Sequence, residues 1–512
     1  MKGGILKMND NKSQKLSRFT GISKHGVILS IIIIVVLVLA FLFQIAIGMI
    51  PAHYLKWNVT GSSTFKVSYN TSEWLKNELK EDVNIYLLGN SGKENEVYLF
   101  LSDVAQKNRH ISLEVIDSKK DPDFINAYGG VWPKENLSIL VASKNRYKIL
   151  NNSELYYYYN QTQQMRYSPI EYAYILEDGR KYIEMYPNQG YDQVLAAFVA
   201  DTIPHFDGET QVISALKYVL MDEVSTLYAV TGTTAGLDTG LTGELWKYGY
   251  EIKNLASVQN IPADCDLLVL QASKDINDLE KIVLDSYLKN GGKLYLTTFC
   301  GAGDMKNLGS VLEQYGMDFL EETHILMEGD QNYFPQNMIR AHILQHDATG
   351  TFTGIFLVDL ANTGLHVIDI KETEGVTVTP WLQTSEKGYF FSAGDPPKTQ
   401  EDLDKIEKKT YTFGAIAEKG DTRIVWVATP SALSASADTQ SNGGNFGLAS
   451  SAFRWMTDTN QTIFSANAPI IETSYLTVSD QAFVMWGTIL VVILPLAILI
   501  LGIMIWYARK RK

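Results

Sequence analysis

The sequence predicts a mixed α/β fold that is held at a membrane by two transmembrane helices. Short apolar segments typical of buried strands alternate with segments of helical spacing through most of the chain. Two long runs without a formal charge lie near the termini, at 27–50 and 483–508, and no comparable run lies between them. About 20 apolar residues cross a bilayer as a helix, so each run is long enough to span.

Basic residues flank both apolar runs on their outer sides. Six Lys or Arg and one Asp precede the first run, and Arg509, Lys510, Arg511 and Lys512 follow the second. Clustered Lys and Arg stay in the cytoplasm. We therefore expect a protein of the cell membrane with transmembrane helices at 26–50 and 481–508. Its tails at 1–25 and 509–512 would be cytoplasmic, and the large region between the two helices would be extracellular. A cleaved signal peptide, with Ala46-Ile47-Gly48 near its cleavage site, is the alternative, but signal cores are usually about 7–15 residues long.

The region between the two runs is acidic and poor in cysteine. It holds 56 of the 57 acidic and 34 of the 44 basic residues, which gives a net charge of −22. Such a surface repels phosphate backbones and anionic headgroups, so nucleic acid is excluded as a partner. Cys265 and Cys300 are the two cysteines, and we expect no disulfide because they would lie at opposite ends of a parallel sheet.

The first extracellular part, 51–160, has the element order of a thioredoxin-like domain. A helix starts near Ser68, with Asn70 or Thr71 as its cap. The predicted elements that follow are a strand at 83–88, a helix at 95–108, a strand at 110–117, a short helix at 122–128 and two strands at 136–143 and 146–151. No Cys-x-x-Cys occurs, so thiol exchange is excluded. The tyrosines at 156–159 suit a half-buried strand, with stacking on a polymer as the alternative.

The second extracellular part, 161–480, predicts a doubly wound parallel sheet. Helices at 209–219, 241–249, 277–292 and 306–319 alternate with strands at 225–230, 250–255, 267–270 and 293–298. Short links between alternating strands and helices are typical of parallel sheets with helices on both faces. From 321 onward the sequence has more β character, and the charged, Pro-containing stretch 393–409 predicts an exposed loop.

Small, hydroxyl-rich loops follow three of these strands. They read TGTTAG (231–236), QASK (271–274) and TFCGAGD (298–304). Ligands of doubly wound sheets bind beyond the carboxyl ends of the strands. The candidate ligand or partner residues are therefore Thr231, Thr233, Thr234, Ser273, Cys300 and Asp304, and the alternative is that these loops only connect elements.

The residues in and around these loops argue against several kinds of catalytic site. Cys300 follows Phe299, whose bulk does not suit a nucleophile elbow, and no His-Asp set stands nearby. The glycines after Cys300 lack the third glycine of a dinucleotide loop, and no P-loop motif occurs, so any nucleotide hydrolysis must come from another chain. His342 and His346 lack the glutamate of a metalloprotease motif. We expect no catalytic residue, no metal and no cofactor, and therefore no enzyme activity.

Several stretches resemble those of the gliding-motility-type (GldG-like) ABC transporter auxiliary family. They are STFKVSYNTSEWLKNELKEDVNIYLL, LDSYLKNGGKLYL, GVTVTPWLQTSEKGYF and DTRIVWVATPSAL, in this order between the two apolar runs. The resemblance implies a second domain similar to glutamine amidotransferase-like domains without their catalytic residues. It also implies a non-catalytic, membrane-anchored accessory or binding-protein-like subunit that works with a separate ABC ATPase and a multispan permease.

One departure from that family limits what the resemblance implies. The family often has a Gly-His-Gly-Glu-like turn after the strand that ends at Val230, where this chain has Gly232-Thr233-Thr234-Ala235-Gly236. No role of that histidine and glutamate is therefore expected here. Two alternatives remain open from the sequence: an extracellular binding or adhesion protein for a cell-surface polymer, and a surface enzyme with an unrecognised site.

Overall fold

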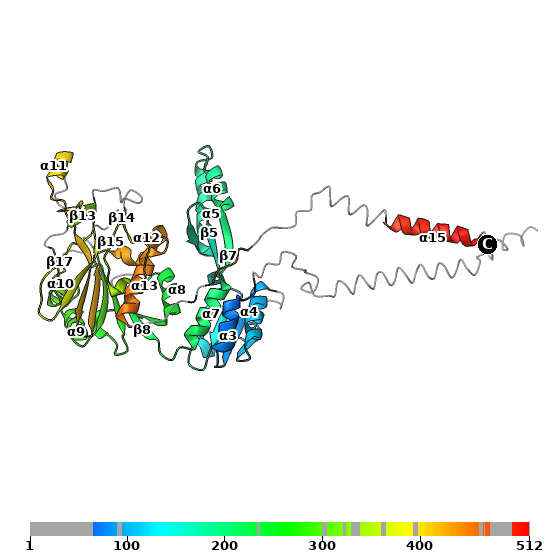
Figure 1. Ribbon diagram of the computed structural model, residues 1–512, viewed down its shortest axis with the longest axis horizontal. Helices are drawn as coiled ribbons and strands as arrows, with labels where there is room; N and C mark the ends of the chain where they lie inside the picture. The colour runs from blue at the N-terminus through cyan, green and yellow to red at the C-terminus, as the bar shows by residue number, and fades with distance from the viewer. Residues whose placement is uncertain are drawn as a thin grey trace, which may run out of the picture. The chain divides into compact units, whose positions relative to one another are not determined.

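The computed structural model describes most of the region between the two apolar runs. The described residues are 65–89, 95–232, 236–299, 305–320, 324–328, 338–359, 365–392, 398–459, 464, 466–471 and 494–510. Residues 66–89 and the described residues from 100 onward belong to one compact unit. Helices and sheets alternate along the chain (Figure 1), so the predicted mixed α/β fold is confirmed.

The two expected transmembrane helices fall largely outside the described residues. Residues 26–50 and 481–493 are not among them, and α15 (Leu494–Lys510) contains 17 residues of the second run and its basic end. Within the described ranges, no helix is both long and apolar enough to span a bilayer.

A four-stranded mixed sheet lies in the first part of the chain, in the order β2-β1-β3-β4. Its strands are β1 (Val83–Leu88), β2 (Ile111–Ile116), β3 (Ser138–Ala142) and β4 (Tyr147–Leu150). The central β1 pairs parallel with β2 and antiparallel with β3, which pairs antiparallel with β4. The accompanying helices are α3 (Tyr69–Asn77), α4 (Glu96–Lys107), η1 (Phe124–Tyr128) and η2 (Asn152–Leu155).

The cap of α3 differs from the expected one. Ser68, with an extended backbone, accepts a hydrogen bond from the Thr71 N–H through its hydroxyl group, so Ser68 is the N-cap. The expectation of Asn70 or Thr71 as the cap is wrong, because both residues already lie inside the helix.

A three-stranded antiparallel sheet follows, with a helical hairpin between two of its strands. The strands are β5 (Tyr156–Asn160), β6 (Met165–Tyr167) and β7 (Thr202–Phe206), in the order β6-β5-β7. Tyr157 stacks on His205 with ring centroids 4.8 Å apart, and Tyr158 stacks on Tyr172 at 4.0 Å. The tyrosines at 156–159 are half-buried, so their predicted place in a half-buried strand is confirmed.

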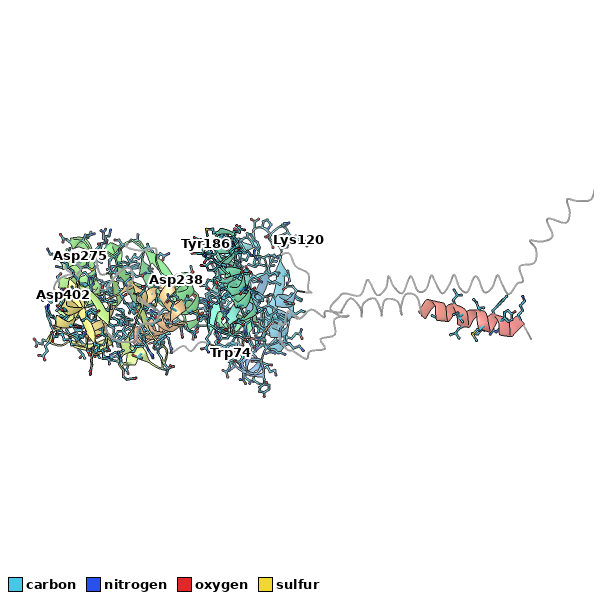
Figure 2. The ribbon with its side chains drawn as sticks, turned by 90° about the horizontal axis from the view of Figure 1, so that it is seen from above. Trp74, Lys120, Tyr186, Asp238, Asp275 and Asp402 are labelled. Carbon is cyan, nitrogen blue, oxygen red and sulfur yellow. The ribbon has the colours of Figure 1, made fainter. Side chains whose placement is uncertain are left out.

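A hairpin of α5 (Pro169–Met185) and α6 (Tyr191–Ala200), not predicted from the sequence, lies between β6 and β7. Its start carries a clear signal, because Ser168 and Glu171 form a capping box and a proline occupies the first turn. None of the residues of α5 or α6 is buried, and Tyr186, near the end of α5, is 48% exposed (Figure 2). Part of the hairpin's apolar surface is therefore exposed, while Tyr172 of α5 packs against Tyr158 of β5.

An eight-stranded sheet forms the centre of the second part, in the order β15-β18-β20-β21-β11-β10-β8-β9. The five strands from β21 to β9 are parallel, and β20, β18 and β15 extend the sheet in antiparallel fashion. The parallel strands are β8 (Ser225–Val230), β9 (Tyr250–Leu255), β10 (Leu267–Ala272), β11 (Lys293–Thr298) and β21 (Thr422–Val427). The others are β15 (His342–Ile343), β18 (Thr377–Gln383) and β20 (Thr412–Lys419).

Helices cover both faces of this sheet. Figure 1 shows α9 (Asp278–Lys289) and α10 (Lys306–Leu312) on one face and α13 (Gly444–Met456) on the other. Helix α9 ends at a glycine pair: Gly291 adopts φ +88°, and the Gly292 N–H donates to the Tyr287 carbonyl. Strands β8, β10, β11 and β21 are buried along almost their whole length, as parallel strands covered on both faces are.

Apart from α7, the remaining elements of this part are short. They are α7 (Gly208–Val219), α8 (Thr239–Leu245), η3 (Trp246–Tyr248), η4 (Val258–Asn260), η5 (Glu313–Tyr315), β12 (Met317–Phe319), β13 (His324–Glu328), β14 (Met338–Arg340), η6 (Asp347–Thr349), β16 (Leu357–Asp359), β17 (Ile368–Ile370), β19 (Gly388–Ser392), α11 (Gln400–Lys405), η7 (Pro430–Leu433) and α12 (Ala435–Gln440). The short helix α11 lies where the sequence predicted only a loop. Helix α7 contacts β3 and β4 of the first sheet and also η3, so it is buried along nearly its whole length.

Candidate functional site

The carboxyl ends of β8 and β10 lie side by side at a change of strand order. In sequence order the five parallel strands are arranged 2-1-3-4-5, and the order reverses between β8 and β10. Thr231 directly follows β8, and Ser273 directly follows β10. Ligands of open α/β sheets bind at such a point, so the fold places these two candidates where a crevice is expected.

The other four candidate residues fall outside the described residues. These are Thr233, Thr234, Cys300 and Asp304. Their positions relative to Thr231 and Ser273 therefore stay predictions.

The polar groups at this edge are engaged by the protein. The Thr231 N–H donates to the Leu255 carbonyl at 2.8 Å, and the Gln271 side-chain amide donates to the Gly236 carbonyl at 3.1 Å. A Cβ on Gly232 would lie 2.2 Å from the Ala256 carbonyl oxygen, so this glycine is required by a close approach of two backbones. These contacts give the loop after β8 a structural role.

Asp275 gives the loop after β10 a similar role. Its two carboxylate oxygens accept from the N–H groups of Asn307 and Leu308, at 2.9 and 3.0 Å, and so cap the start of α10 (Asp275 is labelled in Figure 2). The QASK loop is thereby tied to the next helix along the edge.

A buried histidine that the sequence analysis did not single out lies near the end of β11. His366 is 8% exposed, and its Nδ1 lies 3.4 Å from the Thr298 hydroxyl, which also accepts from the Trp426 indole N–H at 3.0 Å. Phe319 packs edge-on against the imidazole. This is a packed polar contact inside the core, and spacing in the sequence gives no sign of it.

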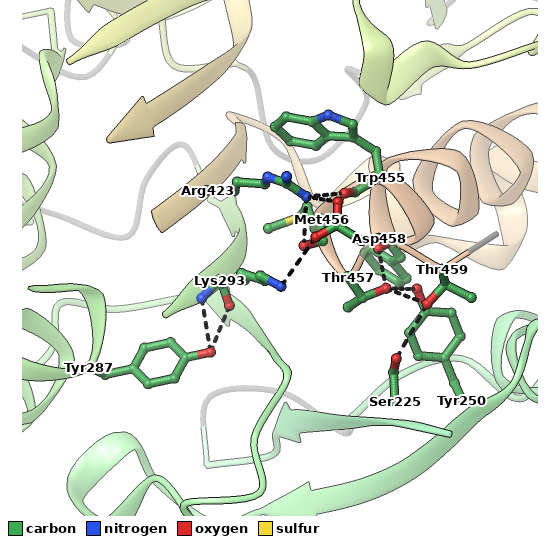
Figure 3. A network of polar contacts seen from close by, with 11 residues as sticks. Ser225, Tyr250, Tyr287, Lys293, Arg423, Trp455, Met456, Thr457, Asp458 and Thr459 are labelled. Atoms are coloured by element: carbon green, nitrogen blue, oxygen red, sulfur yellow. Dashed lines mark hydrogen bonds and ion pairs between the residues drawn. The ribbon is translucent and has the colours of Figure 1, made fainter. Parts of the chain in front are cut away.

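The opposite edge of the parallel sheet holds a polar network (Figure 3). Arg423 donates to the carbonyls of Trp455 and Met456 and to the Asp458 carboxylate at 2.8 Å. Tyr250 and Thr457 hydroxyls lie 2.7 Å apart. The network satisfies carbonyls at the end of α13 and fixes this helix to the amino ends of the strands, so its role is structural.

The other reactive side chains of the described chain are also held apart. His346 caps η6, and His342 is exposed on the edge strand β15. Cys265 is a free, half-buried thiol 3.7 Å from the Tyr287 hydroxyl, and burial raises its pKa to about 11, which opposes thiolate formation. Within the described ranges, no group of three or more His, Cys, Asp or Glu is placed to hold a metal ion.

A cavity of about 380 Å³ lies where the first sheet meets the start of the second part. The cavity is lined by Lys148 of β4, Glu154 of η2, Tyr218 of α7, Trp246 of η3 and Glu251 of β9, among others. Its volume lies at the lower end of the range for small-molecule sites.

Lys148 is the distinctive group of this cavity. Its Nζ lies 4.4 Å from the centroid of the Trp246 indole ring, a cation–π geometry. Burial lowers the pKa of Lys148 to about 8, Glu154 opposes this shift, and the nearby Lys247 adds to it. Lys247 is itself paired with Glu244 at 2.8 Å.

Two polar groups of the cavity lack the partners they ordinarily have. Among the described residues, the Lys148 ammonium group forms neither a hydrogen bond nor an ion pair, although Glu154 is its Coulombic neighbour. The Trp246 side chain is 3% exposed, and its buried indole N–H finds no hydrogen-bond acceptor in the part of the chain that the structure describes. Of these two groups, the Lys148 ammonium group is the one that can donate to the anionic or carbonyl oxygen of a ligand, because the indole N–H is closed off from solvent.

Comparison with known proteins gives no family for this chain. No family model and no curated protein matches it. Among solved structures, the N-terminal domain of mmIFT52 is 14% identical with a TM-score of 0.33 and covers 45% of this chain and 96% of its own. A ThuA-like protein from Bacteroides uniformis is 11% identical with a TM-score of 0.29 and covers 46% and 93%, and a β-galactosidase from Rahnella sp. R3 is 12% identical with a TM-score of 0.27 and covers 54% and 36%. These TM-scores are too low for the likenesses to bear on the fold or the function of this chain.

Proposed function

We propose that this chain is a non-catalytic, membrane-anchored accessory subunit of an ABC-type transport system. The observation behind the proposal is the pair of apolar runs at 27–50 and 483–508, each flanked by basic residues on its outer side, around a large acidic α/β region. Two such spans place both termini in the cytoplasm and the α/β region outside the cell. The resemblance of the intervening stretches to the GldG-like auxiliary family supplies the partners, an ABC ATPase and a multispan permease.

The proposal also assigns a domain type to each of the two extracellular parts. The order β2-β1-β3-β4, with one parallel and two antiparallel pairs, supports a thioredoxin-like domain in 51–160. The 2-1-3-4-5 parallel strands with helices on both faces support a doubly wound, amidotransferase-like domain in 161–480.

The absence of enzyme activity is part of the same proposal. The described edge at the carboxyl ends of the strands has its polar groups committed to backbone contacts, and the thiol of Cys265 has a raised pKa. Neither arrangement supplies an activated nucleophile with a base in hydrogen-bond reach. The half-buried tyrosines at 156–159 pack against β7 of their own sheet and against helix α5, so they do not favour the alternative of polymer binding.

Co-isolation from native membranes tests the proposal. The full-length chain, tagged at one terminus and extracted in a mild detergent, should bring down an ATPase with a P-loop and a multispan permease. The control is an unrelated two-span protein with the same tag. Isolation of the chain without either partner would contradict the proposal.

A further inference from the structure

The cavity beside Lys148 has a charge pattern that limits what can bind there. Lys148 supplies one cation without an anionic contact, and Glu154 and Glu251 supply two carboxylates on the same lining. The Glu154 carboxylate is fixed in place because it accepts from the Asn151 N–H in a capping box. Glu251 is half-exposed, and its nearest cation is Lys253, 3.8 Å away.

A ligand with charge of one sign meets repulsion in this cavity. A simple anion that pairs with Lys148 faces the two carboxylates, and a simple cation that pairs with a carboxylate faces Lys148. A ligand with both charges satisfies both sides, because its carboxylate pairs with Lys148 and its ammonium group with Glu154 or Glu251.

The rest of the lining suits the body of such a ligand. Tyr218 and Trp246 pack edge-to-face, with ring centroids 5.9 Å apart, and present an aromatic surface beside the charged groups. Thr242 adds a small polar side chain at the rim. A volume of about 380 Å³ holds a molecule of amino-acid to short-peptide size.

We propose that this cavity binds a zwitterionic ligand, a free amino acid or a short peptide, between Lys148 and the carboxylates of Glu154 and Glu251. The site goes beyond the transport function proposed above and does not depend on it, since it lies within this chain alone. Its failure and the failure of the transport proposal are therefore separate results.

Calorimetric titration of the purified full-length chain in detergent tests the site with a matched set of probes. L-Phenylalanine and glycyl-L-phenylalanine carry both charges, 3-phenylpropionate lacks the ammonium group, and 2-phenylethylamine lacks the carboxylate. We expect at least one of the two zwitterions to bind, and each singly charged probe to bind at least about tenfold more weakly than it. The proposal is overturned if neither zwitterion binds at low millimolar concentration, or if a singly charged probe binds as well.

Substitutions assign the binding to the cavity. Lys148→Met keeps an unbranched side chain over the Trp246 ring and removes the charge, so affinity for the zwitterion should fall about tenfold or more. Lys144→Met, on the exposed turn before β4, is the matched control and should leave affinity unchanged. Glu251→Gln changes a half-exposed side chain. It should weaken the binding of the zwitterion, whereas the binding of 3-phenylpropionate should stay the same or become tighter. Unchanged zwitterion affinity in both Lys148→Met and Glu251→Gln would overturn the assignment.

Discussion

Removing the Glu209 carboxylate should loosen the start of α3 more than any surface change. Glu209, at the start of α7, is 7% exposed and accepts hydrogen bonds from the N-cap of α3. The Ser68 hydroxyl donates to it at 2.6 Å and the Ser68 N–H at 3.1 Å, and the fully buried Thr71 hydroxyl donates to the same carboxylate. One side chain thus joins two helices that lie more than a hundred residues apart in the sequence.

The expected magnitude follows from these contacts. A hydrogen bond to a charged group contributes about 1.5–3 kcal/mol, and a buried donor left without a partner costs about 1–3 kcal/mol. Because such terms are not additive, we expect Glu209→Ala to lower the opening free energy of α3 by about 3–4 kcal/mol. Glu209→Gln keeps one acceptor oxygen and should cost about half as much.

Hydrogen exchange of the full-length chain, followed by mass spectrometry, measures this effect locally. A loss of about 3 kcal/mol accelerates amide exchange more than about a hundredfold, so peptides covering α3 should exchange at least that much faster in Glu209→Ala. Glu223→Ala, at an exposed position three residues beyond α7's C-cap, is the control and should leave α3 unchanged. The reasoning would be refuted if the opening free energy of α3, measured by amide exchange, changed by less than about 0.5 kcal/mol in Glu209→Ala.

Three further predictions concern titration, packing and thiol reactivity. Burial raises the pKa of the Asp438 carboxyl to about 6 from its usual 3.8, so the folded chain holds this proton more tightly and the contribution of Asp438 to stability falls as pH rises from about 4 to 6. Asp438→Asn should therefore raise the free energy of unfolding in urea at pH 8, by at most about 3 kcal/mol, and change it little at pH 4; an equal change at both pH values would contradict this. Gly444→Ala places a Cβ 1.9 Å from the Ile355 carbonyl oxygen and should destabilise by about 2 kcal/mol in the same assay, whereas Gly243→Ala, with nothing within 4 Å, should not. Cys265, with its pKa raised to about 11, should react with iodoacetamide at pH 8 far more slowly in the folded chain than in urea, and equal rates would show that its thiol is not shielded.

Local signals in the sequence were sufficient for single elements. The Asn277 cap marks the start of α9, and Gly291 marks its end. The alternation of strands and helices between 225 and 298 predicts the parallel strands of the large sheet. The rule for parallel sheets also places Thr231 and Ser273 at neighbouring strand ends. These features depend on residues close together in the chain or on the handed, regular connection of strands.

Features that depend on distant residues could not be predicted in the same way. Strands β18 and β20 pair antiparallel although a long, partly charged stretch separates them in the sequence. The periodicity of apolar residues can predict a strand, but it does not identify the strand's partner in the sheet. The cavity combines Lys148 with Trp246, which are brought together only when α7 packs between β4 and η3. The α5–α6 hairpin was missed for a different reason, because its capping signal at Ser168 and Glu171 was present and not used.

ATP hydrolysis in the isolated material tests the central claim most directly. The claim is that this chain has no nucleotide-hydrolysing site and acts beside a separate ATPase. Full-length chain isolated from its native membranes should carry vanadate-sensitive ATP hydrolysis, and the same chain produced alone in a foreign host should carry none. Hydrolysis by the chain produced alone, or no hydrolysis in the native isolate, would contradict the account.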